Sequence, residues 1–152
     1  MTQNNNEQQM PPLQINAQYI KDLSFEAPDM PSALLELKVP PEININIDLR
    51  ANKTKNENTY MVDLSLRLNA KIKETDKTLF LCELVYGALA TLNTPQDQHE
   101  PILMVQIPHL IFPYARAIIG NLIREAGLPA LQINPIDFAG LYQAKLAQKE
   151  KA

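Results

Sequence analysis

Apolar and polar side chains alternate along three stretches of the chain, residues 13–27, 43–49 and 60–70. Successive side chains of a β-strand point to opposite faces, so this period of two predicts three strands, each with a buried face and a solvent-exposed face. Pro28 follows the first stretch and Pro40 precedes the second, and proline is typical of strand ends and edges. We therefore expect these stretches to form a sheet.

A fourth stretch, residues 78–92, is apolar at both alternating sets of positions apart from Glu83. A short turn through residues 74–76 joins it to the preceding strand, which predicts a hairpin. A strand that is apolar on both faces has to be covered on both, by helices, by another sheet or by another subunit. In a chain of this size, a second subunit is one candidate for that cover.

The hydrophobic period changes to that of a helix after a loop expected at residues 93–101. Apolar side chains then recur at helical spacing from Ile111 to Ile123, with Pro113 placed to open a helix and Gly127 to close it. Small side chains within this helix permit close packing against another element.

A second helix is expected after residues 134–137, where Asn134 supplies an N-cap and Pro135 and Asp137 suit a first turn. Its apolar face carries Phe138, Leu141, Tyr142 and Leu146. The predicted fold class is α+β, a four-stranded antiparallel sheet followed by two helices in a single domain.

The two ends of the chain are expected to lie outside this domain, which covers residues 13–144. Residues 1–12 are mostly Asn, Gln and Pro, a composition that predicts a disordered arm. They lack the basic and apolar regions of a secretory signal, and no later stretch reads as long or apolar enough to span a bilayer, so we expect a cytoplasmic protein. Residues 145–152 hold three Lys and one Glu and are expected to form a flexible Lys-rich tail.

Residues that commonly carry catalysis are scattered along the chain. His99 and His109 have no Cys or acidic partners at metal-ligand spacing. The single cysteine, Cys82, lies in an apolar stretch, which favours a small buried hydrophobe over a nucleophile. The 4 glycines are too widely separated to form a phosphate-binding loop, and a net charge of −3 argues against nucleic acid. The sequence predicts a protein that is not an enzyme and needs no metal or cofactor.

Two patterns in the sequence are candidates for a functional role. Asp22 and Glu26 share the solvent-exposed face of the first predicted strand with Ser24 between them, and side chains two apart on a strand face lie about 7 Å apart. They form an acidic stripe, although the pattern alone fits a solvated strand face as well. The ladder of Ile43, Ile45 and Ile47 fits a core strand as well as a binding groove.

Four runs of residues are closely similar to segments of one family. Residues 21–28 (Lys-Asp-Leu-Ser-Phe-Glu-Ala-Pro) resemble the first strand of SecB export chaperones, and residues 111–116 (Ile-Phe-Pro-Tyr-Ala-Arg) resemble the start of their long helix. Residues 80–87 resemble the fourth strand, and residues 129–141 resemble the entry to the final helix. The runs occur in the family's order and span about residues 13–144.

The resemblance implies an ATP-independent chaperone that binds unfolded precursor proteins and delivers them to the SecA motor, without membrane insertion. It also implies a homotetramer, a dimer of dimers. The interface positions are then Cys82, Ala115 and Gly120. The SecA-binding positions on the sheet surface are Asp22, Glu26, Leu81 and Glu83. The client-binding groove corresponds to Ile43, Ile45, Ile47, Phe138, Leu141 and Tyr142.

One departure concerns the groove. The family often carries a tryptophan just before the second strand, whereas residues 37–41 read Leu-Lys-Val-Pro-Pro and the chain contains no tryptophan. Two other functions stay open at this point. One is a general cytoplasmic holdase without a dedicated export role, and the other is a small enzyme whose site forms between subunits.

Overall fold

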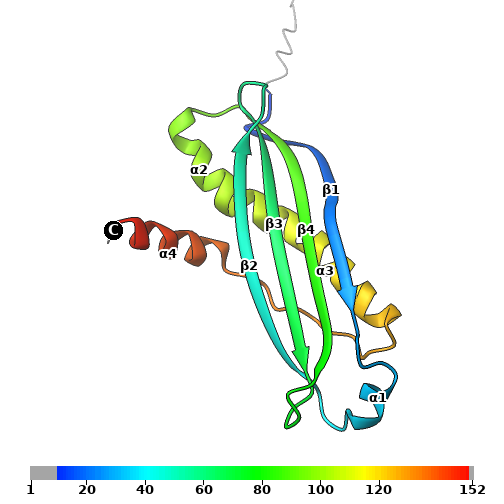
Figure 1. Ribbon diagram of the computed structural model, residues 1–152. Helices are drawn as coiled ribbons and strands as arrows, with labels where there is room; N and C mark the ends of the chain where they lie inside the picture. The colour runs from blue at the N-terminus through cyan, green and yellow to red at the C-terminus, as the bar shows by residue number, and fades with distance from the viewer. Residues whose placement is uncertain (1–9, 151–152) are drawn as a thin grey trace, which may run out of the picture.

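The computed structural model describes residues 10–150 and has a sheet with helices on one side (Figure 1). The strands are β1 (Leu13–Glu26), β2 (Glu42–Lys53), β3 (Thr59–Lys71) and β4 (Thr78–Leu92). The helical segments are α1 (Ser32–Glu36), η1 (Gln96–Gln98), α2 (His99–Pro101), η2 (Ile102–Gln106), α3 (Ile107–Glu125) and α4 (Phe138–Glu150). The strand order is β1-β4-β3-β2 with every neighbouring pair antiparallel, which confirms the predicted α+β class.

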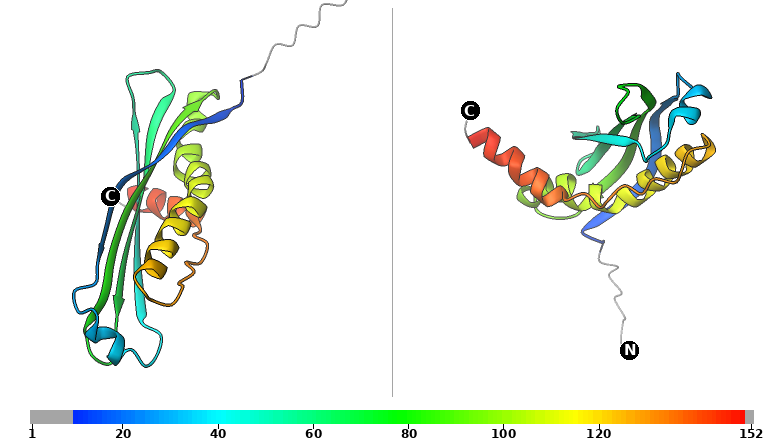
Figure 2. Two further views of the ribbon diagram at one scale, coloured as in Figure 1. Left: turned by 90° about the vertical axis from the view of Figure 1, so that its right-hand side faces the viewer. Right: turned by 90° about the horizontal axis from the view of Figure 1, so that it is seen from below.

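The helices lie on one face of the sheet, and Figure 2 shows the opposite face bare. We call these the covered and the uncovered face. The core lies between the covered face and α3, where large apolar side chains from β3, β4 and the helix are almost fully enclosed. They include Leu64, Leu66, Leu68, Phe80, Leu84, Ile111, Ile119 and Ile123. Burial of this apolar surface is the main favourable contribution to folding.

The first strand does not keep one face throughout its length. Two register shifts, after Ile15 and after Ile20, each insert an extra residue and so exchange the faces. Ile15 therefore lies opposite Ala90 on the covered face, whereas Tyr19 lies opposite Gly87 on the uncovered face. The expectation of one continuous apolar face over residues 13–27 was wrong, because a bulge leaves no mark in the alternation of residue types.

The long helix begins earlier than its hydrophobic period indicated. A continuous helical stretch runs from Gln96 to Glu125, so most of the loop expected at residues 93–101 is helical and Pro113 lies inside α3 rather than at its start. Pro113 is exposed, which places the hydrogen bond that proline cannot make on the solvent side. A π-helical segment, η2, interrupts the regular hydrogen-bond ladder upstream of it.

The end of α3 agrees with the prediction. Gly127 has a φ of +82°, and the N–H of Leu128 donates to the carbonyl of Ile123 at 3.3 Å. A left-handed glycine followed by such a bond is a common way to end a helix. The chain then runs without regular secondary structure over residues 128–137, which we call the crossover segment.

The final helix is capped by a different residue from the one predicted. The Asp137 carboxylate accepts the N–H of Gly140 at 3.0 Å, so the N-cap is Asp137 and not Asn134. The helix continues to Glu150. Residues 145–150 are therefore helical where a flexible tail was predicted, and residues 151–152 lie outside the described residues.

The other end of the chain is partly fixed as well. The carbonyl of Pro12 accepts the backbone N–H of Asn93 at 2.9 Å, and the carbonyl of Pro11 accepts its side-chain amide at 2.9 Å. The last part of the predicted arm is thus attached to the end of β4. Residues 1–9 lie outside the described residues. The sequence pattern also missed α1, a helix of 5 residues between β1 and β2.

The expectation that no stretch could span a bilayer was also wrong. The helical stretch Gln96–Glu125, with a mean hydropathy of 1.5 over its most apolar 18 residues, is long and apolar enough to do so. The packing of this helix within the domain is another explanation for its apolar composition. Ile107, Ile111, Ile119 and Ile123 are fully enclosed against the sheet, as in the core helix of a globular domain.

Candidate functional site

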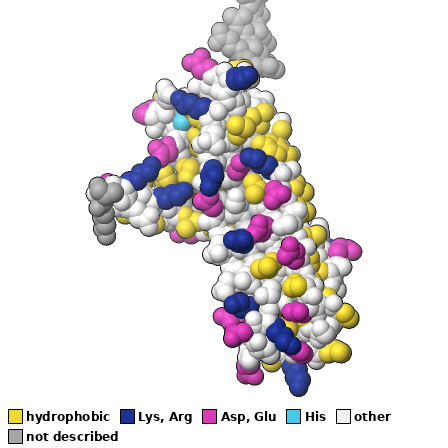
Figure 3. Space-filling view, in the orientation of Figure 1, with side chains coloured by type: hydrophobic (Ala, Val, Ile, Leu, Met, Phe, Trp, Pro, Cys, Tyr) yellow, Lys and Arg dark blue, Asp and Glu magenta, His cyan; other side chains and the backbone are white. Residues whose placement is uncertain are grey.

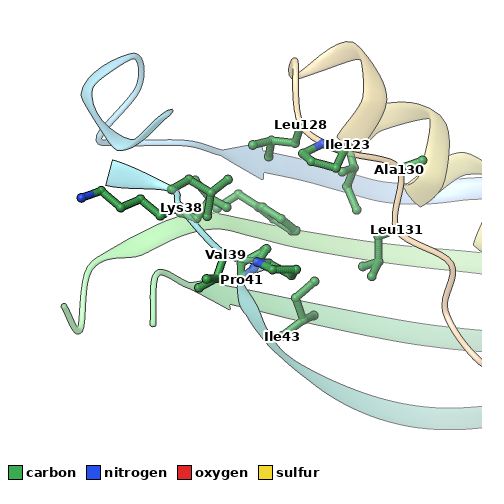
Figure 4. Close-up of a pocket in the computed structure, with 13 residues that line it drawn as sticks. Lys38, Val39, Pro41, Ile43, Ile123, Leu128, Ala130 and Leu131 are labelled. Atoms are coloured by element: carbon green, nitrogen blue, oxygen red, sulfur yellow. The ribbon is translucent and has the colours of Figure 1, made fainter. Parts of the chain in front are cut away.

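An apolar hollow of about 440 Å³ opens between the start of β2 and the crossover segment. Its floor is formed by Leu79, Phe80 and Ile123, which belong to the core. Figure 4 shows Val39, Pro41 and Ile43 facing Leu128 and Leu131 across it. The only charged residue in the lining is Lys38, whose side chain extends away from the other labelled residues (Figure 4). This hollow can therefore receive an apolar side chain without offering it a polar partner.

A second hollow lies at the other end of β2, beneath α4. It measures about 750 Å³ and adjoins a smaller one of about 190 Å³, with which it shares Leu49, Met104 and Tyr142. Its lining is mixed, with apolar side chains from η2 and β2 beside polar ones from α4. The hollows lie in a line between β2 on one side and the crossover segment and α4 on the other, and we call this line the groove, although Ile45 lines none of the three hollows.

The β2 isoleucines lie along the strand between the two ends of this groove. Ile43, Ile45 and Ile47 point to the covered face but are only half-buried. Ile43 lines the first hollow and Ile47 lines the smallest one, with Ile45 between them. The sequence could not show that these residues escape full burial, because that depends on how far the crossover segment stands from β2.

The three predicted groove residues of α4 have different surroundings. Leu141 is 43% exposed, and Tyr142 is half-buried and lines both hollows beneath α4. Phe138 is only 3% exposed and packs edge-on against Phe112, with ring centroids 6.0 Å apart. Phe138 therefore anchors α4 to α3, and the expectation that it lines the groove was wrong.

Local environment also affects the tyrosine hydroxyl at this end of the groove. Desolvation, followed by the negative charge of Glu100 and a hydrogen bond to it, raises the pKa of Tyr142 above its ordinary value. Tyr142 thus keeps a neutral hydroxyl beside an acidic side chain.

A buried polar pair fixes the floor of the second hollow. The Tyr60 hydroxyl lies 2.8 Å from Nδ1 of His99, and Nε2 of His99 lies 2.9 Å from the carbonyl oxygen of Thr94. A carbonyl can only accept, so Nε2 carries a proton and, in the neutral ring, Nδ1 accepts from Tyr60. The sequence offered neither histidine a partner at metal-ligand spacing, and the structure gives His99 a structural role.

The predicted acidic stripe lies on the uncovered face. Asp22 and Glu26 stand opposite Val85 and Leu81 and are both exposed, and no ion pair within residues 10–150 involves either carboxylate. Leu81 is half-buried beside them. The structure therefore brings these three predicted positions together on one surface.

Cations interrupt this acidic surface. Glu83, the fourth predicted position, forms an ion pair with Arg67 at 2.6 Å, and Lys21 forms one with Asp63 at 2.7 Å. The hydrogen bond to Asp63, and then its charge, raise the pKa of Lys21. Figure 3 shows both signs of charge interspersed over this face. Such exposed pairs contribute little to stability. Asp22, Glu26 and, on the edge strand β2, Glu42 are the carboxylates of this face without an ion pair among residues 10–150.

The predicted subunit-interface residues lie mostly inside the protomer. Cys82 and Ala115 are fully enclosed in the core, and burial raises the pKa of the Cys82 thiol. Their side chains therefore have no surface to offer a second copy, which corrects that expectation. Gly120 is partly exposed, and a Cβ placed there would make an ordinary contact at 3.8 Å with the Leu131 carbonyl oxygen, so packing within this protomer does not require a glycine at this position.

Other apolar side chains remain exposed on the outer side of α3 and on the covered face of β1. They are Ile20, Leu23, Leu110 and Tyr114. Tyr114 is 55% exposed although the helix that carries it is largely a core helix. The sequence could have indicated this exposed apolar side of α3. Leu110 and Tyr114 are four residues apart, so they share a side of the helix, and that side does not face the core.

Among residues 10–150 no group of three or more His, Cys, Asp or Glu side chains is placed to hold a metal ion. The groove instead combines an apolar end, a row of half-buried isoleucines and an end with a mixed lining. Its geometry suits an extended polypeptide better than a small polar substrate.

Comparison with known proteins gives the family. A family profile described as "Preprotein translocase subunit SecB" matches residues 6–149. This chain belongs to the SecB family. The resemblance carried by the four sequence runs is thereby confirmed, and the SecB family consists of protein-export chaperones.

Individual SecB relatives match most of the chain. "Protein-export protein SecB 1" of Gluconobacter oxydans is 44% identical over 146 residues, covering 91% of this chain and 84% of the relative. "Protein-export protein SecB" of Gluconacetobacter diazotrophicus is 45% identical over 142 residues, covering 88% and 83%. A solved SecB-like chaperone of Mycobacterium tuberculosis, in complex with a peptide from an antitoxin, matches the fold with a TM-score of 0.67 at 12% identity, covering 82% of this chain and 90% of that one.

We predict that Tyr60→Phe destabilises the SecB fold, because it leaves the buried Nδ1 of His99 without a donor. The expected loss in free energy of unfolding is about 1–2 kcal/mol, measured by urea denaturation. Tyr114→Phe, which changes an exposed hydroxyl, is the matched control and should leave that free energy within about 0.5 kcal/mol. Equal effects of the two substitutions would contradict the assigned role of the buried pair.

Proposed function

We propose that this chain is an ATP-independent holdase of the cytoplasm, which keeps unfolded secretory precursors competent for translocation and passes them to SecA. The observation that carries the proposal is the groove along β2. It leaves Ile43, Ile45 and Ile47 half-buried between an apolar hollow and hollows of mixed lining, in a chain that belongs to a family of protein-export chaperones.

Apolar contact is suited to a chaperone with many clients. Burial of apolar surface contributes about 25 cal/mol per Å² and has no directional requirement, so different sequences can occupy one groove. Ordering an unfolded client opposes this gain by several kcal/mol, which keeps each local contact reversible. Binding the unfolded state and not the native one selects clients that fold slowly.

Several grooves acting together supply the affinity that one groove lacks. We propose that the chain forms a dimer of dimers, in which the exposed apolar side chains of β1 and α3, Leu23 and Tyr114 among them, meet a second copy. A precursor bound in one groove would then meet the next at a high effective concentration. Release needs no nucleotide, because each contact is weak on its own.

Delivery to SecA is assigned to the uncovered face. Asp22 and Glu26 are carboxylates there without an ion pair among the described residues, as is Glu42 on the opposite edge strand, and Leu81 lies beside Asp22 and Glu26 with part of its side chain exposed. Free carboxylates around an apolar centre would attract a basic surface on the motor and guide its approach. The groove and this surface lie on opposite faces of the sheet, so client and motor can bind at the same time.

We predict that Ile45→Arg weakens binding of a chemically unfolded precursor by at least about tenfold, because the arginine would place a charge in the apolar groove. Asn46→Arg on the same strand is the matched control, since Asn46 points to the uncovered face. Binding is measured by titration of a labelled precursor, with circular dichroism as the check on folding. An equal loss in both variants would show that the groove along β2 is not the client site. Unfolding of the Ile45 variant alone would mean that Ile45 belongs to the core.

We also predict that Asp22→Lys together with Glu26→Lys weakens SecA binding about tenfold at low salt and less at high salt, because screening reduces the charge contribution. The control is Glu57→Lys together with Glu74→Lys, which makes the same change in net charge in two loops. Precursor binding should persist in both variants. Unchanged SecA affinity in the first variant would show that the docking surface lies elsewhere and would favour a general holdase.

A further inference from the structure

A lysine lies next to one of the exposed carboxylates of the uncovered face. Lys21 is the extra residue of the second bulge in β1, because the pairing of β1 with β4 skips it between Ile20 and Asp22. Its ammonium group lies 2.7 Å from Oδ2 of Asp63, and among residues 10–150 it forms no ion pair with Asp22. A cation thus stands one residue from Asp22 without neutralising it.

The ion pair of Lys21 crosses a whole strand. In the sheet β4 lies between β1 and β3 (Figure 1), so Lys21 of β1 reaches over β4 to Asp63 of β3. The strand is thin at this point, because Gly87 of β4 stands between Tyr19 and Asp63 in register. A Cβ at Gly87 would come within 2.5 Å of Cε2 of Tyr19, so the tyrosine ring occupies the space of the missing side chain. A glycine at this position therefore allows side chains of β1 to lie across β4.

Burial decides which carboxylate binds Lys21. Asp63 is only 8% exposed, whereas Asp22 is exposed to water. Within residues 10–150, Lys21 is the one side chain that hydrogen-bonds the Asp63 carboxylate, and the buried Oδ1 atom of Asp63 has no partner there. A buried carboxylate attracts a cation more strongly than a hydrated one does, and leaving it unpaired costs free energy of folding. Lys21 is therefore held by Asp63, and Asp22 keeps its charge.

Two arginines of the same face are occupied as well. Arg50 lies 3.4 Å from Asp48, and Arg67 lies 2.6 Å from Glu83. Asp22 therefore remains without an ion pair among the described residues although these cations share its face. The cation that stands next to it in the sequence is the one held by the buried carboxylate of β3.

We infer that Asp63 is a positioning residue of the motor-docking surface, which holds Lys21 away from Asp22 so that Asp22 presents an uncompensated negative charge. The inference rests on the proposed docking of SecA at Asp22 and Glu26, and it adds a residue that acts without touching the motor. Once the charge of Asp63 is removed, the Lys21 ammonium is free to turn to Asp22. The docking surface then loses negative charge where a basic partner approaches.

The test measures the affinity of purified SecA for the full chain and for three variants at low salt. Asp63→Asn removes the carboxylate and keeps the shape of the side chain, and SecA affinity should fall at least about threefold. Adding Lys21→Gln to Asp63→Asn removes the released cation, so affinity should return to within about 1.5-fold of the unaltered chain. Glu36→Gln is the matched control, because it frees Lys77 from an ion pair of 2.8 Å between α1 and the β3–β4 turn and makes the same change in charge. The control should keep the affinity of the unaltered chain.

Unchanged SecA affinity in the Asp63→Asn variant would overturn the inference. Equal losses in Asp63→Asn and Glu36→Gln would overturn it too, because they would indicate an effect of net charge. A loss that persists after Lys21→Gln is added would mean that Asp63 contacts the motor or supports the fold, and not that it restrains Lys21. Precursor binding and circular dichroism, measured on the same samples, should not change. If Asp63→Asn does not fold, Asp63→Val takes its place with the same rescue, since valine suits a strand.

The variant Asp22→Lys with Glu26→Lys separates this inference from the proposed function. If that variant binds SecA as tightly as the unaltered chain does, the proposed docking surface is wrong and the inference fails with it. If it loses affinity while Asp63→Asn keeps it, the docking surface stands and the role of Asp63 alone is wrong.

Discussion

The rest of the structure depends on how the sheet is covered, because both of its faces carry apolar side chains and the chain supplies helices for only one. The long helix α3 packs across β3 and β4 and encloses Ile111, Ile119 and Ile123 there. It does not extend over the edge strand β2, which leaves the isoleucines of that strand half-buried. Incomplete cover is costly in water, so it is expected where another molecule completes it.

The crossover segment turns this incomplete cover into a groove. Residues 128–137 have no regular secondary structure and cross the covered side of the sheet on the way to α4 (Figure 1), with Leu128 and Ile133 enclosed in the core. Phe138 then fixes the start of α4 against Phe112, so the helix is held over the far end of the groove while Leu141 and Tyr142 stay accessible. The apolar end of the groove and the end with a mixed lining are consequences of this one path of the chain.

The sequence predicted the strands because a period of two is a direct result of strand geometry, and it predicted the fold class from their order. It placed Tyr19 on the wrong face because bulges do not change residue type, and it started the long helix too late because prolines at its solvent side interrupt the pattern. It could not separate Ile45 from Cys82, since both are apolar residues of strands. Only the path of the covering segment decides that one is half-buried and the other enclosed.

The central claim is that an unfolded chain occupies the groove between β2 and the crossover segment. Amide hydrogen exchange, compared with and without a chemically unfolded precursor, tests it most directly. Slower exchange confined mainly to residues 37–49 and 128–142 is the predicted result, because a bound segment would shield these amides from water. Protection located instead on β1 and the uncovered face, with no change in those two ranges, would contradict the account.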